Sequence, residues 1–316
     1  VQIVDQWAFG ITVERVPEGT HGSPWLHLYL ARWVEGQWMI AYENDPVFQD
    51  WLRQAPDNLL NSAQRSALIR AEGGGMGDGS ALLSLPFATG ETWTLTGGPH
   101  GGIEGAVRPW SALDFSQSGS GLVRAARNGV VWRSSTCPNF VRLDHSGWKT
   151  GYYHLTNEVV SNGQSVATGQ ELGRESAYHG CGGSTSGAHV HFTVRNNDNN
   201  GVNINGMDIG GWTVEDGASA YTGCLRRISD GLRRCQWSNI YNDGSIGSGQ
   251  PTSGQNLLSN PGFESNMSSW TFNPSSGHGC NWTTSYGGAQ SGSKMLSFHR
   301  PSGVSCFSLS QTVGVV

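Results

Sequence analysis

The first 70 residues carry two kinds of hydrophobic periodicity. In 25–30, leucines alternate with aromatic and histidine side chains, which predicts a strand with two unlike faces. A turn at Glu35-Gly36 leads into a second expected strand over 38–42. Asp45-Pro46 then begins a predicted helix whose apolar residues recur at i, i+3, i+4 and i+7, and Pro56 ends it. This part of the chain therefore predicts a small α/β domain.

The rest of the chain has almost no helical periodicity. After a glycine-rich linker at 71–82, residues 83–242 consist of short apolar stretches separated by Gly, Asn and Ser, which predicts strands and turns. A Gly/Ser-rich linker follows at 243–255, and 256–316 opens a further β unit. We expect a mainly β chain: an α/β domain at 1–70, a central antiparallel β-sheet domain at 83–242 and an incomplete β-sandwich at 256–316.

Composition narrows the class of protein. The 316 residues suit two or three domains, and a net charge of −5 argues against a nucleic-acid partner. No apolar run reaches the roughly 18–20 residues of a membrane span, so a membrane protein is not expected. Six cysteines without a Cys-x-x-Cys pair suit an exported protein with disulfides. Because the first residue is Val1, we expect a signal peptide to have been removed or to lie outside this sequence.

The segment Ser184–Val194 (STSGAHVHFTV) carries the most distinctive chemistry. His189 and His191 lie two residues apart, so in a strand both imidazoles project from one face. The intervening valine and phenylalanine form the opposite, apolar face. The pair alone fits either a metal or catalytic site or two hydrogen-bonded structural histidines.

Other residues strengthen the metal interpretation. His100 lies in Gly97–Gly102 (GGPHGG), expected as a loop that allows close backbone approach, and Asp114 sits between apolar neighbours, where a carboxylate needs a counter-charge. Two histidines and a carboxylate with an open fourth position are typical of catalytic zinc. Tyr153 and His154 end another expected strand. The remaining histidines are interpreted as surface or turn residues: His21, His27, His145, His179, His278 and His299.

The order His…Asp-Phe, Tyr-x-His-Leu, then Ser-x-Gly-x-His-x-His-Phe resembles the lysostaphin-type zinc endopeptidases over about 83–242. The long spacing between His100 and Asp114 is similar to the staphylolysin and β-lytic endopeptidase branch, whereas commoner members have His-x-x-x-Asp. The resemblance implies a duplicated-hybrid-motif β fold. It also implies a secreted, monomeric, extracellular enzyme that cuts bacterial peptidoglycan cross-bridges, expected to be glycine-rich, with a zinc-activated water.

The resemblance also implies the site residues. His100, Asp114 and His191 would bind one Zn²⁺ per chain, and His154 and His189 would be catalytic. Tyr153 would help to hold the transition state, with a packed strand aromatic as the alternative.

The cysteine pairing is implied in the same way. The even count and the resemblance together imply disulfides Cys137–Cys181 and Cys224–Cys235, and Cys280 is expected to pair with Cys306.

Three further expectations concern the N-terminal segment, the 224–235 hairpin and the C-terminal segment. Residues 1–83 lie where related secreted proteases carry a propeptide, so they are expected to be dispensable for catalysis and to inhibit it. The four arginines of 224–235 are either a solvated hairpin or a contact for anionic cell wall. The terminal segment resembles a carbohydrate-binding module, in which Trp270 and Trp282 would stack on sugars or lie in a core.

Two other functions compete with the enzyme. One is a catalytically idle wall- or glycan-binding protein with the same fold, which would not hold zinc with an open position. The other is a cupin-like metalloprotein, which would need a glutamate shortly after His191; residues 193–196 supply none.

Overall fold

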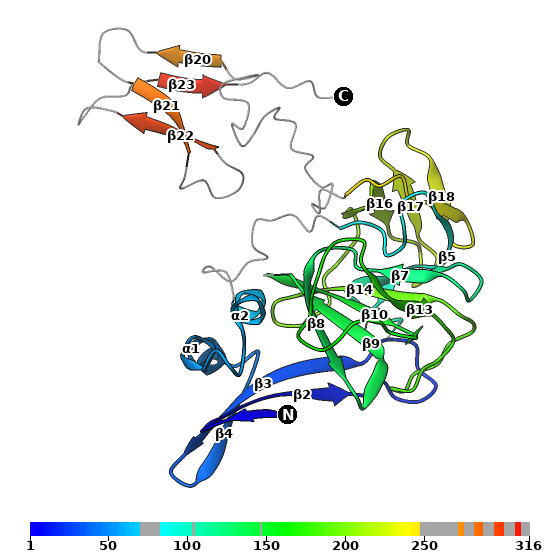
Figure 1. The fold of residues 1–316 in the computed structure, drawn as a ribbon. Coiled ribbons are helices and arrows are strands. Elements are labelled where there is room, and N and C mark those ends of the chain that lie inside the picture. The colour runs from blue at the N-terminus through cyan, green and yellow to red at the C-terminus, as the bar shows by residue number, and fades with distance from the viewer. Residues whose placement is uncertain are drawn as a thin grey trace. The chain divides into compact units, whose positions relative to one another are not determined.

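The computed structural model describes residues 1–69, 83–102, 105–145 and 147–246, and the backbone of four strands between 271 and 310. The chain divides into two compact units, Val1–Thr252 and Ser253–Val316. The described strands far outnumber the helices and the sheets are antiparallel, so the expected mainly β class is confirmed (Figure 1). No helix in the described ranges is long and apolar enough to cross a membrane.

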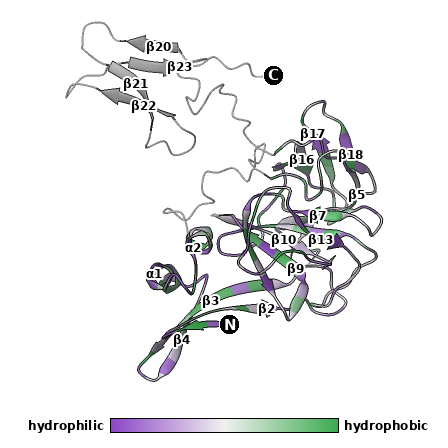
Figure 2. Ribbon diagram, viewed as in Figure 1, coloured by the Kyte–Doolittle hydropathy of each residue, from purple (hydrophilic) through white to green (hydrophobic). Residues whose placement is uncertain are grey.

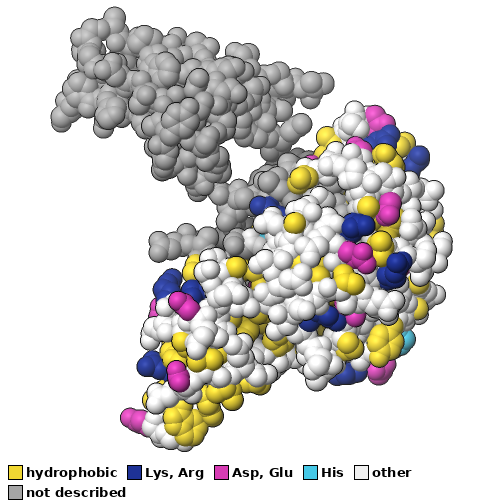
Figure 3. All heavy atoms as spheres, viewed as in Figure 1, with side chains coloured by type: hydrophobic (Ala, Val, Ile, Leu, Met, Phe, Trp, Pro, Cys, Tyr) yellow, Lys and Arg dark blue, Asp and Glu magenta, His cyan; other side chains and the backbone are white. Residues whose placement is uncertain are grey.

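The chain begins with a four-stranded antiparallel sheet, in the order β1 (Gln2–Val4), β2 (Trp7–Glu14), β3 (Trp25–Val34), β4 (Gln37–Tyr42). The two predicted strands are β3 and β4, joined by a turn in which Glu35 and Gly36 have φ of 49° and 84°. Figure 2 shows hydrophobic and hydrophilic residues alternating along β3. The leucines of β3 face the core, and hydrophobic side chains gather on the surface of the β3–β4 hairpin, as Figure 3 shows.

Two helices follow this sheet: α1 packs on β3 and β4, and α2 lies against α1 and β8. Helix α1 (Pro46–Gln54) begins and ends as the sequence predicts, and it buries Phe48 and Leu52. The short helix α2 (Ser62–Leu68) was not expected from the sequence. Its start is fixed by a capping box, in which Asn61 and Gln64 exchange side-chain and backbone hydrogen bonds of 2.9 Å each.

The centre of the first unit is an eight-stranded antiparallel sheet, in the order β12-β8-β9-β10-β14-β6-β5-β19. Its strands are β5 (Thr92–Gly101), β6 (Trp110–Ser116), β8 (Gly129–Ser134), β9 (Cys137–Asp144), β10 (Trp148–Tyr153), β12 (Ser165–Val166), β14 (Val190–Asn196) and β19 (Asn239–Tyr241). One face packs a hydrophobic core that includes Leu113, Phe115, Val190, Phe192 and Val194. The opposite face of β5, β6 and β14 is thereby free to present polar side chains.

Two smaller sheets flank the large one. The first has the order β11-β13-β7, made by β11 (Leu155–Thr156), β13 (Glu171–Glu175) and β7 (Leu122–Arg124). The second has the order β15-β16-β17-β18, made by β15 (Asp208–Ile209), β16 (Trp212–Glu215), β17 (Cys224–Arg227) and β18 (Arg233–Cys235).

The N-terminal sheet shares a core with the large sheet. Phe9 and Phe48 belong to the same buried cluster as Trp132, Phe140 and Tyr153. The first 69 residues therefore pack tightly on the central domain, and the expected boundary at 70–83 remains a prediction.

A buried ionic network joins the same two parts. The guanidinium of Arg142 donates to both carboxylate oxygens of Glu43 at 2.7 and 2.6 Å and to Asp144 at 2.6 and 2.8 Å. The ammonium of Lys149 donates to Glu43 at 2.8 Å. The buried guanidinium of Arg195 donates to Ser23 at 2.9 Å, a further contact between the two parts.

The second unit is described only as strands. β20 (Thr271–Pro274) pairs with β23 (Phe307–Ser310), and β21 (Asn281–Tyr286) pairs with β22 (Lys294–His299). Cys280, Cys306 and Trp270, and the side chain of Trp282, lie outside the described residues, as do the linker 71–82 and most of 243–255.

Candidate metal centre and active-site cavity

Three adjacent strands bring the predicted metal ligands together. His191 lies on β14 directly opposite Asp114 on β6, and Asp114 lies opposite Gly97 on β5. His100 belongs to the irregular end of β5, which contains register shifts, rather than to the expected loop. Gly97 is required here, because a Cβ at this position would lie 2.4 Å from an Asp114 carboxylate oxygen. The sheet therefore converts distant sequence positions into one polar cluster.

The donor atoms are close enough to share one ion. Nδ1 of His191 lies 2.9 Å from Oδ1 of Asp114 and 3.0 Å from Nε2 of His100, which is 3.4 Å from the same Asp114 oxygen. Tetrahedral zinc with bonds of about 2.0–2.1 Å separates its ligand atoms by about 3.3 Å. The other nitrogens of His100 and His191 face the carbonyls of Gly98 and Gly102 at 2.7 and 3.4 Å, the arrangement that orients metal-binding imidazoles. All three residues are buried, and within the described part of the chain they form a set that fits a metal ion.

The electrostatics of the cluster favour an ionised Asp114 and a neutral His191. Burial alone would raise the pKa of Asp114, but the charges of His100 and His189 and hydrogen bonds from His100 and His191 hold it well below its ordinary value. Burial lowers the pKa of His191 despite its contact with Asp114. An ionised carboxylate and a neutral imidazole are the protonation states that a cation requires of these two ligands.

The two predicted catalytic histidines lie beside the metal donors. His154 follows β10 with φ of 63°, and its ring centroid is 4.6 Å from that of His189. Nδ1 of His154 faces the Tyr178 carbonyl at 3.1 Å, and Nδ1 of His189 faces the Gly187 carbonyl at 2.9 Å. Nε2 of His189 lies 3.6 Å from Asp114. The expectation that 189 and 191 share one face, opposite the apolar side chains of β14, agrees with this placement.

Tyr153 is placed behind His154 rather than over the donors. Its hydroxyl donates to the Gly182 carbonyl at 2.7 Å and accepts from the Cys181 N–H at 3.3 Å, while its ring lies 4.1 Å from that of His154. Burial raises the pKa of Tyr153 to about 12. These contacts favour a role in supporting His154, and direct contact with a transition state stays a prediction.

Two residues at the site were missed by the sequence analysis. The ring of Tyr221 stacks on His100 at 4.0 Å between centroids, and its buried hydroxyl has no hydrogen-bond partner among the described residues. His21, expected to be an ordinary surface histidine, is exposed but lies 5.9 Å from Tyr221, ring to ring. No periodic pattern marks either residue, because both lie in irregular segments.

The cluster opens into a cavity of about 620 Å³. Asp114, His154, His189, His191 and Tyr221 all line it, so two of the three predicted ligands and both predicted catalytic histidines border one accessible space, whereas His100 and Tyr153 do not line it. The remaining lining residues are His21, Gly22, Thr94, Thr96, Ser116, Ser118, Ser184, Ser186, Gly187, Ala188, Gln236 and Trp237.

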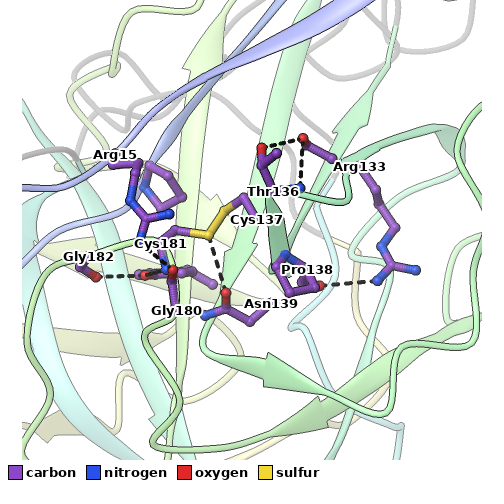
Figure 4. The surroundings of a disulfide bond; sticks show 12 residues. Arg15, Arg133, Thr136, Cys137, Pro138, Asn139, Gly180, Cys181 and Gly182 are labelled. Atoms are coloured by element: carbon purple, nitrogen blue, oxygen red, sulfur yellow. Dashed lines mark hydrogen bonds between the residues drawn. A yellow bond between two sulfur atoms is a disulfide. The ribbon is translucent and has the colours of Figure 1, made fainter. Parts of the chain in front are cut away.

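Both disulfides implied for the central domain are present. Cys137 is bonded to Cys181 and Cys224 to Cys235, which confirms these pairs. The first pair fastens the loop that carries Gly182 to β9, and Figure 4 shows Arg15 reaching the Gly180 carbonyl beside it, at 2.6 Å.

The arginines of the 224–235 hairpin are largely paired. Glu215 accepts from Arg226 at 2.5 Å and from Arg233 at 2.6 Å, and Asp230 accepts from Arg227 at 2.9 and 2.5 Å. These contacts favour the solvated hairpin over an anion-binding surface.

His145 has the structural role expected of it. Its ring nitrogens face the Asn128 carbonyl at 2.7 Å and the Thr150 hydroxyl at 2.8 Å. Burial lowers its pKa to about 4, so the ring stays neutral.

Comparison with known proteins adds independent information. The model of Peptidase family M23 matches residues 108–205. Protease LasA of Pseudomonas aeruginosa is 33% identical over 217 residues, covering 63% of this chain and 50% of the relative. Beta-lytic metalloendopeptidase of Lysobacter enzymogenes is 31% identical over 159 residues, covering 46% of this chain and 87% of that protein. Peptidoglycan DD-endopeptidase ShyB of Vibrio cholerae is 31% identical over 96 residues, covering 29% of this chain and 22% of the relative. The chain spans about half the length of the LasA proteins it matches, 50% and 42%.

Proposed function

Because the chain belongs to peptidase family M23, a family of metalloendopeptidases, we propose that it is a secreted zinc endopeptidase that hydrolyses peptidoglycan cross-bridges, with glycine-rich bridges preferred. The observation that carries the proposal is the convergence of two histidines and one carboxylate, with two further histidines beside them, at the edge of one cavity. A relative named as a peptidoglycan endopeptidase supports the substrate. The two disulfides support an oxidising, extracellular location.

His100, Asp114 and His191 would hold Zn²⁺. When bound, this ion supplies a Lewis acid that polarises the scissile carbonyl and makes water a better nucleophile at neutral pH. The carboxylate and two neutral imidazoles satisfy its preference for nitrogen and oxygen donors and leave a fourth position for substrate or water.

His154 and His189 would move the protons. Burial, together with the neighbouring histidines, holds the pKa of His154 well below its ordinary value, so its ring is neutral and can accept a proton from water. His189, whose ring lies 4.6 Å from that of His154, can pass a proton to the departing amine. The carbonyls of Tyr178 and Gly187 fix one nitrogen of each ring, which leaves Nε2 for the reaction.

Tyr221 would supply a neutral hydrogen-bond donor for the oxyanion. Its hydroxyl is buried in the cavity wall without a protein acceptor among the described residues. Burial raises the pKa of Tyr221, so the hydroxyl keeps its proton. A developing negative charge on the scissile carbonyl would accept that hydrogen bond.

The N-terminal domain would act as an inhibitory prosegment through residues 15–23, here called the covering segment. The Val16 N–H donates to the Cys181 carbonyl at 3.0 Å, and Gly19 N–H donates to Gly183 at 3.4 Å. The approach is close enough that a Cβ on Gly182 would lie 1.8 Å from the Val16 oxygen. The covering segment thus pairs with the cavity wall as an extended peptide does when it adds to a strand.

The covering segment continues along the far end of β5. The Gly105 N–H donates to the His21 carbonyl at 2.7 Å, and the Ser23 N–H donates to the Gly102 carbonyl at 3.1 Å. Because most of these contacts are between backbone groups, a substrate with little side chain would satisfy the same partners. The segment would therefore compete with a glycine-rich peptide for one end of the cavity.

The experiment compares peptidoglycans that differ in their cross-bridges. The full chain is assayed before and after limited proteolysis in the glycine-rich stretch 71–82, and products are identified by mass spectrometry. We expect release of peptides cut within glycine-rich bridges, and faster release after proteolysis and removal of residues 1–70. The His191→Ala chain is the control for contaminating activity. A wild-type chain that neither binds zinc nor releases peptide in either form would instead support the idle wall-binding protein.

A further inference from the structure

One end of the cavity is built without charged side chains. Beyond the metal donors, hydroxyl groups from two neighbouring strands form its floor, with Thr94 on β5 opposite Ser116 on β6. Ser116 shares a strand face with Asp114, because the two are separated by one residue. Among all the residues that line the cavity, Asp114 is the sole carboxylate, and none is lysine or arginine. A charged ligand group would lose its hydration at this end without gaining a counter-charge.

Trp237 forms the wall at this end and is unusually exposed. Its side chain is 68% exposed, whereas Trp93, Trp132 and Trp212 are almost completely buried. Its backbone has φ of 67°, a conformation that bulky residues rarely adopt and that clusters at ligand sites. The fold holds an aromatic ring out toward the cavity rather than into a core.

The backbone around Trp237 is nevertheless firmly anchored. The Trp237 N–H donates to the Leu95 carbonyl at 2.7 Å, and the Leu95 N–H donates to the Ser238 carbonyl at 2.9 Å. The Gln236 amide donates to the Thr96 carbonyl at 2.9 Å, and the Cys224–Cys235 disulfide lies two residues before Trp237. An exposed indole on a fixed backbone is a preorganised contact surface, because little conformational entropy is lost when a ligand covers it.

Trp237 and the covering segment lie at opposite ends of β5. The contacts of Trp237 are with Leu95 near the start of this strand, and those of the covering segment are with Gly102 and Gly105 just past its end. The metal donors lie between them. The end of the cavity that the covering segment contacts is here called the covered end. A peptide that crosses the metal donors from the covered end therefore continues over Trp237.

We propose that Trp237 is the platform of a substrate subsite that takes an uncharged, extended peptide segment, such as consecutive glycines, across the scissile bond from the covered end. The proposal rests on the proposed function and specifies how that site selects its substrate. Amide planes without a Cβ can lie flat on the indole, and the hydroxyl floor can exchange hydrogen bonds with peptide N–H and C=O groups. A sugar ring would also stack on tryptophan. However, the ligand group that reaches Trp237 is part of the same peptide chain that is cut at the metal donors.

The test measures binding, so that it does not depend on turnover. Capped oligoglycines of three to six residues and N-acetylglucosamine oligomers are titrated calorimetrically into the full chain and the Trp237→Ala, Trp237→Phe and Trp38→Ala variants. Trp38 is the matched control, since it is 39% exposed on β4 and does not line the cavity. We expect affinity for oligoglycine to rise with length in the wild type. Trp237→Ala should weaken binding of the longer peptides about three- to tenfold, whereas Trp237→Phe and Trp38→Ala should retain most of it.

Two results would overturn the subsite. One is an unchanged length dependence in Trp237→Ala, and the other is a wild type that binds the sugar oligomers, but not oligoglycine, through Trp237. By contrast, a chain that binds oligoglycine through Trp237 but cuts no peptidoglycan would contradict the proposed function and leave the subsite in place.

Discussion

Replacing Glu43 with glutamine should weaken the attachment of the N-terminal sheet. The carboxylate of Glu43 accepts hydrogen bonds from Arg142 and Lys149, and all three side chains are buried at the junction. Glutamine keeps the shape but removes the charge, so two buried cations lose a shared counter-ion. Removing one partner of a buried ion pair is strongly destabilising, because the remaining charge stays desolvated.

The size of the effect follows from the pKa of Glu43. Burial alone would raise this pKa, but the charges and hydrogen bonds of Arg142 and Lys149 lower it from an ordinary 4.5 to about 2. Each pKa unit corresponds to about 1.4 kcal/mol, so the ionised carboxylate stabilises the folded chain by on the order of 3 kcal/mol. Because the folded-state pKa is depressed, this stabilisation is complete above pH 4.5 and disappears as the pH falls toward 2.

Urea unfolding, followed by tryptophan fluorescence at pH 7, 5, 4 and 3, measures both the loss of stability in Glu43→Gln and its dependence on pH. The Glu43→Gln chain should unfold at lower urea at pH 7, and the difference from wild type should shrink below pH 4.5. Glu14→Gln is the matched control, because its side chain is 73% exposed on the same sheet and its nearest ionic partner is His27 at 3.7 Å. If Glu43→Gln unfolds at the same urea concentration as Glu14→Gln at pH 7, the network does not hold the sheet as we argue.

Three further predictions concern the site. His191→Ala should lose zinc and peptidoglycan hydrolysis together, whereas His154→Ala should keep about one zinc per chain and lose about 10²–10⁴-fold in activity. Atomic absorption measures the zinc content and a lysis assay measures the activity. Loss of zinc from His154→Ala would contradict the division of roles. Tyr221→Phe should lower kcat with little change in KM, because its hydroxyl acts on the transition state; steady-state kinetics on a soluble peptide measures this, and a change in KM alone would refute it. Replacing both Cys224 and Cys235 with serine should lower the free energy of unfolding by about 2–4 kcal/mol, measured by urea denaturation, and an unchanged midpoint would argue against it.

The sequence predicts well those features that repeat along the chain. The alternation of side-chain types in 25–30 and 189–194 predicts both the strand and the face on which each side chain lies, because successive side chains of a strand point to opposite faces. Pro46 and Pro56 likewise predict where helix α1 begins and ends. His100 and Asp114 are singled out by their glycine-rich and apolar neighbours, but their roles as ligands come from the resemblance, because their closeness depends on the pairing of β5 with β6 and leaves no local pattern.

The features that the sequence does not predict depend on irregular backbone. Tyr221 lies in a glycine- and serine-rich loop, and its position over His100 is fixed by hydrogen bonds to Gly98 and Pro99 backbone atoms. The covering segment contacts the cavity wall largely through main-chain groups, so its side chains give no signal. Helix α2 is seven residues long, too short for a clear apolar period.

The two disulfides determine at which stage of folding the cavity reaches its final form. Its floor consists of hydrogen-bonded strands that need no oxidant. Trp237, at one end, follows Cys235 by two residues, and Gly182, which pairs with the covering segment, directly follows Cys181. In a reducing compartment the metal donors would assemble on the floor while both walls lacked their covalent ties. Oxidation would therefore act as the finishing step of folding, and the cavity would take its final width only in an oxidising compartment.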